Sequence, residues 1–85
     1  MINEKVLSSV FGNYDIHNVI LLPMDETYNF VISNMPSSIS LERWKYLENI
    51  LKDITKKEIN LFAFSQAISH FGEETLKKGM VIKSE

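Results

Sequence analysis

The 85-residue sequence contains no cysteine, only two prolines and three glycines, and no long apolar run. The absence of cysteine excludes disulfides and thiolate metal sites and favours a cytoplasmic location. The longest apolar run, residues 19–24, is far too short to cross a bilayer, so no membrane association is expected. Residues 1–5 include Glu4 and do not form the basic and apolar pattern of a signal peptide. The formal net charge of −2 does not indicate nucleic acid as a partner.

What remains has the composition of an ordinary globular protein. Hydrophobic residues make up 45% of the chain and charged residues 24%, proportions that do not suggest disorder. A chain of this length is long enough for one domain with a modest core. We therefore expect a single domain that spans residues 1–85.

Several segments have the composition of β-strands. Residues 17–22 form a continuous apolar stretch that Pro23 is expected to end, and residues 28–33 are rich in aromatic and β-branched side chains. The connection between these two segments is so short that it predicts an antiparallel hairpin. Residues 58–64 predict a third strand, and the apolar run at residues 80–82 offers a short fourth one.

Four segments show helical periodicity, namely residues 3–11, 41–55, 65–70 and 73–78. Asn3, Ser40 and Ser65 are suited to cap the first three of these helices, and Gly12 is expected to end the first. The resulting order of elements predicts an α+β domain with a mixed three- or four-stranded sheet packed by helices.

This order resembles the minimal nucleotidyltransferase domain of the polymerase-beta type. Residues 58–62 (Glu-Ile-Asn-Leu-Phe), followed by a short helix and residues 73–82, look like the closing pattern of that family. Residues 28–32 (Tyr-Asn-Phe-Val-Ile) look like its Asp-x-Asp strand, and residues 19–22 look like the strand that enters its Gly-Ser turn. The resemblance rests on the order and pattern of the elements.

The sequence departs from the family pattern at the positions that bind metal. The three aspartates of the family fall on Thr27, Asn29 and Asn60, and its Gly-Ser signature has no counterpart. A neutral amide oxygen cannot replace the carboxylate charge that holds magnesium against water. The resemblance therefore implies a degenerate nucleotidyltransferase that has no catalytic residue, no cofactor and no metal site, and that is not an enzyme.

Two alternatives stay open for the chemistry of the chain. Asp25 and Glu26 are adjacent carboxylates at the tip of the hairpin, where they are either a solvated turn pair or the remnant of a weak nucleotide-binding enzyme. Asn29 and Asn60 either bond each other or a neighbouring backbone group, or line a vestigial ligand pocket. The resemblance itself is accidental if the chain is an independent small α+β protein.

The third strand carries the only indication of a partner. Alternation along residues 58–64 places Asn60, Phe62 and Phe64 on one face, which the resemblance equates with the former active-site face that also bears Asn29. Two phenylalanines on an open cleft would form an exposed apolar patch. We therefore predict a non-catalytic interaction module that binds a protein partner or another copy of itself through these four residues. The resemblance implies an antitoxin-like or regulatory role.

Overall fold

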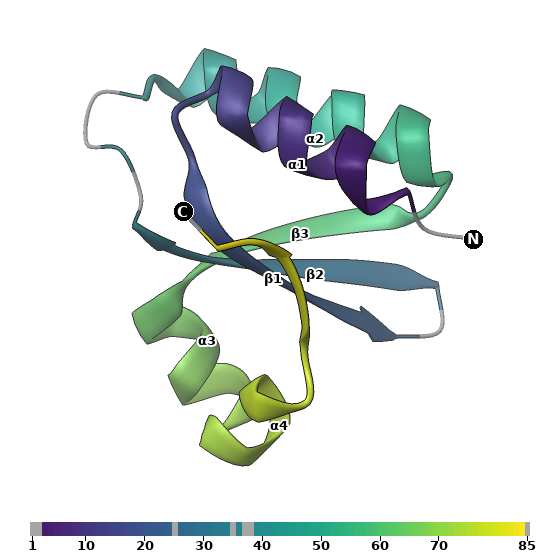
Figure 1. The fold of residues 1–85 in the computed structure, drawn as a ribbon. Helices are drawn as coiled ribbons and strands as arrows, with labels where there is room; N and C mark the ends of the chain where they lie inside the picture. Colours follow the sequence, from purple (N-terminus) through teal and green to yellow (C-terminus); the bar gives the residue numbers. More distant parts are fainter. Residues whose placement is uncertain (1–2, 25, 35, 37–38, 85) are drawn as a thin grey trace.

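The computed structural model describes residues 3–24, 26–34, 36 and 39–84. Within these residues the helices are α1 (Glu4–Asn13), α2 (Leu41–Thr55), α3 (Phe64–Phe71) and α4 (Glu73–Lys77). The strands are β1 (His17–Met24), β2 (Thr27–Asn34), β3 (Glu58–Ala63) and β4 (Met80–Lys83). Figure 1 shows a single sheet with α1 and α2 on one face and α3 and α4 on the other.

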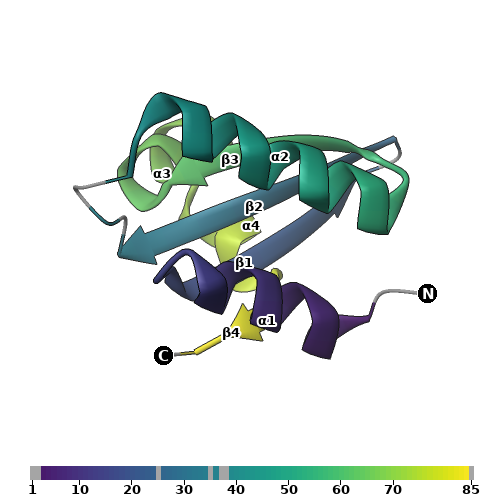
Figure 2. The same cartoon turned by 90° about the horizontal axis from the view of Figure 1, so that it is seen from above.

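The sheet has the strand order β3-β2-β1-β4 in the described part of the chain. β1 and β2 form an antiparallel hairpin, and β4 adds antiparallel to the other side of β1. β3 lies parallel to β2, because α2 crosses one face of the sheet and lets the chain re-enter in the same direction. Figure 2 shows α2 over the β2–β3 side and α1 over the β1–β4 side. The predicted α+β class, mixed sheet and hairpin are confirmed, with four strands.

The hydrophobic core has two parts, one on each face of the sheet. The buried residues of the larger part, beneath α1 and α2, are Leu7, Phe11, Ile16, Val19, Leu21, Phe30, Ile32, Leu47, Leu51 and Ile82. Those of the smaller part, beneath α3 and α4, are Leu22, Val31, Ala67 and Leu76. The central strands β1 and β2 are therefore covered on both faces, which accounts for their continuous apolar sequences.

The helix caps follow the sequence at two of the three predicted positions. The Asn3 side chain accepts a hydrogen bond from the Val6 N–H at 3.2 Å, and the Ser40 hydroxyl accepts one from the Arg43 N–H at 3.2 Å. The long helix α2 has the predicted bounds, residues 41–55. These bounds agree because a cap and a long amphipathic pattern both specify them.

Gly12 does not end the first helix, so that prediction was wrong. Helix α1 continues to Asn13, and the chain then reverses at Asp15, which has a positive φ of 57°. Asp is one of the residues that tolerate the left-handed region. The turn therefore does not need the glycine, and Gly12 lies inside the helix beside Lys83 of β4.

Pro23 does not end the first strand either. It lies inside β1 and pairs with Tyr28 of β2. β4 pairs with β1 only between Val19 and Leu21, so β1 has no strand neighbour on that side at Pro23. A proline without an N–H is tolerated where a strand has a free edge.

The third strand is one residue shorter than predicted. It ends at Ala63, and Phe64 is already the first residue of α3, so Ser65 is not the cap. The side chain of Gln66 reaches back and accepts a hydrogen bond from the Ala63 N–H at 3.1 Å. This contact lets the helix begin directly at the end of the strand, and it takes Phe64 out of the strand alternation.

Candidate functional site

The two asparagines lie opposite each other on neighbouring strands. Asn29 of β2 is in register with Asn60 of β3. The Asn60 Nδ2 donates to the Asn29 Oδ1 at 3.1 Å, and the Asn29 Nδ2 donates to the Leu22 carbonyl oxygen at 3.3 Å. The prediction that both side chains point to the same side of the sheet is confirmed.

This chain of amides leaves the Asn29 side chain little hydrogen-bonding capacity for a ligand. That residue is only 4% exposed, and its side-chain oxygen already accepts from Asn60. Every buried side-chain nitrogen and oxygen of the described residues has a hydrogen-bond partner. Of the two interpretations of this pair, the one in which the asparagines bond each other and the backbone is confirmed. Asn60 itself is exposed at the end of the chain of amides.

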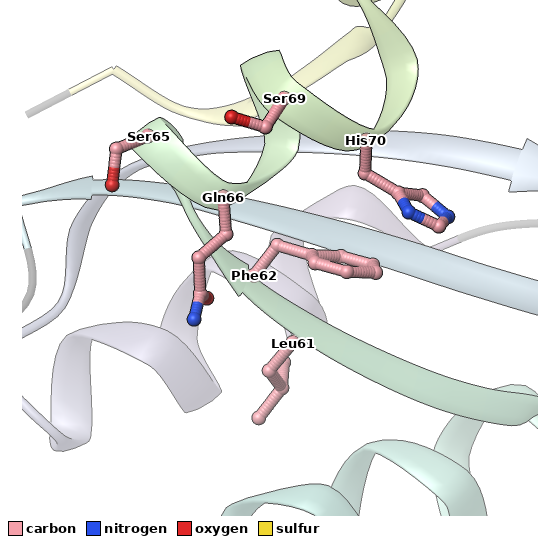
Figure 3. A pocket seen from close by; sticks show the side chains of 6 residues that line it. All are labelled: Leu61, Phe62, Ser65, Gln66, Ser69 and His70. Atoms are coloured by element: carbon pink, nitrogen blue, oxygen red, sulfur yellow. The ribbon is translucent and has the colours of Figure 1, made fainter.

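A groove lies between β3 and α3. It has a volume of about 740 Å³, and its lining residues are Leu61, Phe62, Ser65, Gln66, Ser69 and His70. Figure 3 shows Gln66 and His70 descending from α3 toward β3, while the serines stand on an outer side of the same helix. We call this site the β3–α3 groove.

The floor of the β3–α3 groove is aromatic. The ring of Phe62 stacks on His70 with centroids 5.6 Å apart, and it meets Phe71 edge to face at 5.2 Å. Phe62 also packs against the smaller core and is half-buried, whereas His70 is exposed. Phe62 therefore supports the fold and at the same time presents part of its ring to the groove.

Phe64 does not share a face with Phe62 as the strand alternation predicted. It begins α3, and it does not line the β3–α3 groove. Ile68 follows one helical turn later, and the two side chains are 40% and 38% exposed. Phe64 and Ile68 thus form a separate apolar row on α3. The four residues predicted to bind a partner are therefore a buried amide (Asn29), an exposed amide (Asn60), a residue that lines the groove (Phe62) and a residue that does not (Phe64).

The sequence does not indicate that one edge of β3 is open. The Glu58 N–H points inward and donates to the Glu26 carbonyl oxygen at 3.1 Å. Backbone groups alternate in direction along a strand, so Asn60 and Phe62 also direct theirs to β2, and Ile59 and Leu61 direct theirs outward. β3 is the last strand on its side of the sheet, so these outward groups face no other strand within the described residues.

The hairpin tip does not supply a clear acidic site. Asp25 lies outside the described residues, and Glu26 contributes its backbone carbonyl oxygen to the start of β3. The described residues contain no group of three or more His, Cys, Asp or Glu side chains placed to hold a metal ion. His17 and His70 lie on different elements, β1 and α3.

Comparison with known proteins does not assign the chain to a family. No protein-family model, curated protein or solved structure matches it. The nucleotidyltransferase resemblance therefore stays a prediction. None of the helices in the described residues is both long and apolar enough to span a membrane.

Proposed function

We propose that this protein is a non-catalytic interaction module that binds a protein partner or a second copy through the edge of β3 and the β3–α3 groove. The observation that carries the proposal is the outward edge of β3, where Ile59 and Leu61 have no strand partner in the described part of the chain, beside a groove with an aromatic floor. Added strands gain affinity from main-chain hydrogen bonds and specificity from neighbouring pockets. An antitoxin-like or regulatory role is the version of this function that the family resemblance suggests.

The amide pair supports the non-catalytic part of the proposal. Thr27, Asn29 and Asn60 occupy the positions that the resemblance equates with metal-binding aspartates, and the Asn29 oxygen is used internally. Divalent cations in phosphoryl transfer need several carboxylates that converge on them. The alternative, weak nucleotide binding through Asp25 and Glu26, gains no support from the described geometry.

A site-specific photo-cross-linker tests the interaction surface. Benzoylphenylalanine at Ser69, which lines the β3–α3 groove, is expected to capture a partner in cells of the native host. The same residue at Asn49, which is exposed on α2, is the matched control. Adducts at Ser69 that exceed those at Asn49 support the proposal, whereas equal or absent adducts contradict it.

A transfer assay tests the non-catalytic part separately. The purified chain, incubated with magnesium and each of the four nucleoside triphosphates, should gain no nucleotidyl mass and consume no nucleotide. Covalent nucleotidylation that requires magnesium would show that the chain is an enzyme and contradict the proposal.

A further inference from the structure

We propose that the partner on the β3 edge is a second copy of this chain, paired antiparallel through β3 with Asn60 on the two-fold axis. The inference rests on the proposed function and specifies its partner. It follows from the arrangement of the outward backbone groups along β3, which are bounded at both ends.

Both ends of the outward edge are capped within the chain. The Lys57 N–H donates to the Thr55 hydroxyl at 3.3 Å, and the Ala63 N–H donates to the Gln66 side-chain oxygen at 3.1 Å. Between these caps, the outward N–H and C=O groups are those of Ile59 and Leu61. The free edge therefore consists of two donors and two acceptors.

Only one antiparallel self-pairing satisfies all four groups. If Ile59 faces Leu61 of the second copy, the two-fold symmetry repeats the pair and four hydrogen bonds form. If Leu61 faces Leu61 of the second copy, the Ile59 carbonyl oxygen must accept from the Ala63 N–H of the second copy. That N–H already donates to Gln66. If Ile59 faces Ile59 of the second copy, the Leu61 carbonyl oxygen must accept from the Lys57 N–H of the second copy. That N–H already donates to Thr55. The caps thus select the register centred on Asn60.

The side chains fit this register. Asn60 would face Asn60 of the second copy as a non-hydrogen-bonded pair, with Cα atoms about 4.5 Å apart. Its Nδ2 donates to Asn29 through one proton and has a second proton to give, and its Oδ1 can accept. The two Asn60 amides can therefore bond each other and join both internal amide chains. Glu58 would face Phe62, so no charged residue of β3 faces a like charge.

The second copy is favoured over an unrelated peptide because it adds the Asn60–Asn60 amide contact to backbone hydrogen bonds that any extended chain could supply. Ile59 and Leu61 each offer one donor and one acceptor, and a two-fold axis at Asn60 brings each of them opposite the other in the second copy. An edge this short buries little area, so we expect a weak dimer with a dissociation constant on the order of 100 µM.

Single cysteines test the register, because the natural sequence has none. Asn60→Cys would place two sulfur-bearing residues across the two-fold axis at a Cα distance within the range of disulfides. Glu58→Cys, on the same strand, would place them about 13 Å apart along the strand direction. On oxidation we expect Asn60→Cys to form covalent dimers at least about 10-fold faster than Glu58→Cys. Equal rates, or a faster Glu58→Cys, would overturn the proposal.

A second measurement does not depend on cysteine. Sedimentation of the unchanged chain up to about 1 mM should show a monomer–dimer equilibrium. Asn60→Asp would bring two carboxylates together on the axis and should weaken it at least about 10-fold, while Asn49→Asp, with the same change in charge, should leave it unchanged. A chain that stays monomeric overturns the second copy as partner. If Ser69 then still captures another protein, the interaction module stands, and if it captures nothing, both proposals fall.

Discussion

The two edges of the sheet are protected in different ways. β4 is four residues long, its pairing with β1 contains a register shift, and its last residue is Lys83. Short strands, irregular pairing and lysine are all features that discourage another strand from adding. β3 has six residues and is instead limited by the side chains of Thr55 and Gln66, which cap the N–H of Lys57 just before the strand and the N–H of Ala63 at its end. The β4 edge thus discourages pairing along its whole length, whereas the β3 edge is open to pairing at Ile59 and Leu61.

The attachment of β4 should be the more fragile of the two edges. A Cβ at Gly79, just before β4, would collide with the Ile20 side chain and lie 3.1 Å from Leu22 Cδ2. We expect Gly79→Ala to lower the free energy of unfolding by about 2–3 kcal/mol, as overpacking does. Urea denaturation measures this change.

Gly12→Ala is the control for this effect. Its new Cβ would meet only the end of Lys83, at 3.7 Å from Nζ, and alanine is favoured inside a helix. The free energy of unfolding should rise by about 0.5–1 kcal/mol. A loss of stability of equal size in both variants would show that glycine as such, and not the contact with β1, matters at Gly79.

The attachment of β3 depends on its amide. Asn60→Ala would leave the buried Asn29 oxygen without its donor and should cost about 1–2 kcal/mol in the free energy of unfolding. Asn49→Ala removes an exposed amide from α2 and should change it by less than about 0.5 kcal/mol. Denaturation curves of the two variants that coincide would rule out a stabilising role for the amide pair.

The cap at Ala63 should have a smaller effect. Gln66→Ala would release the Ala63 N–H and cost about 0.5–1 kcal/mol. The exchange of that amide with deuterium should become several-fold faster, as measured by NMR. Ser69→Ala, on the same helix, does not remove the hydrogen bond to the Ala63 N–H and should leave the exchange rate unchanged. If it does not, helix α3 as a whole protects the amide.

The smallest effect on stability is expected at Phe64. Because Phe64 is 40% exposed and belongs to neither part of the core, Phe64→Glu should change the free energy of unfolding by less than about 0.5 kcal/mol. It should also leave the cross-linking of Asn60→Cys unchanged, since Phe64 lies outside the β3–α3 groove. Slower cross-linking in the variant that combines Phe64→Glu with Asn60→Cys would show that Phe64 and Ile68 take part in the contact.

The elements that the sequence predicted well are those that several local signals specify together. Helix α2 has a cap, a long amphipathic pattern and a loop-like composition before it, and its bounds agree with the prediction. The boundary between β3 and α3 has no loop, so the alternation in the sequence predicts a strand that is one residue too long, through Phe64. The contact that decides this boundary is the return of the Gln66 side chain, which no periodicity reports.

The candidate site was predictable only in part, for a similar reason. The facing positions of Asn29 and Asn60 were expected from the family resemblance, which equates both with aspartates of one metal site, and the register agrees with this. Which side of β3 would be free could not follow, because the strand order depends on how the helices pack across the sheet. The outward groups of Ile59 and Leu61 become visible only when that order is known.

The amide pair also bears on how the chain folds. It joins residues 31 positions apart, across the parallel connection that contains α2, so β3 must find its place on β2 after a long loop has closed. A slip of one residue would bring Asn29 opposite Ile59 or Leu61 and would bury its amide oxygen with no donor. The correct alignment is thus marked by a polar contact within an apolar sheet. The two asparagines therefore favour the correct register of the parallel pairing between β2 and β3.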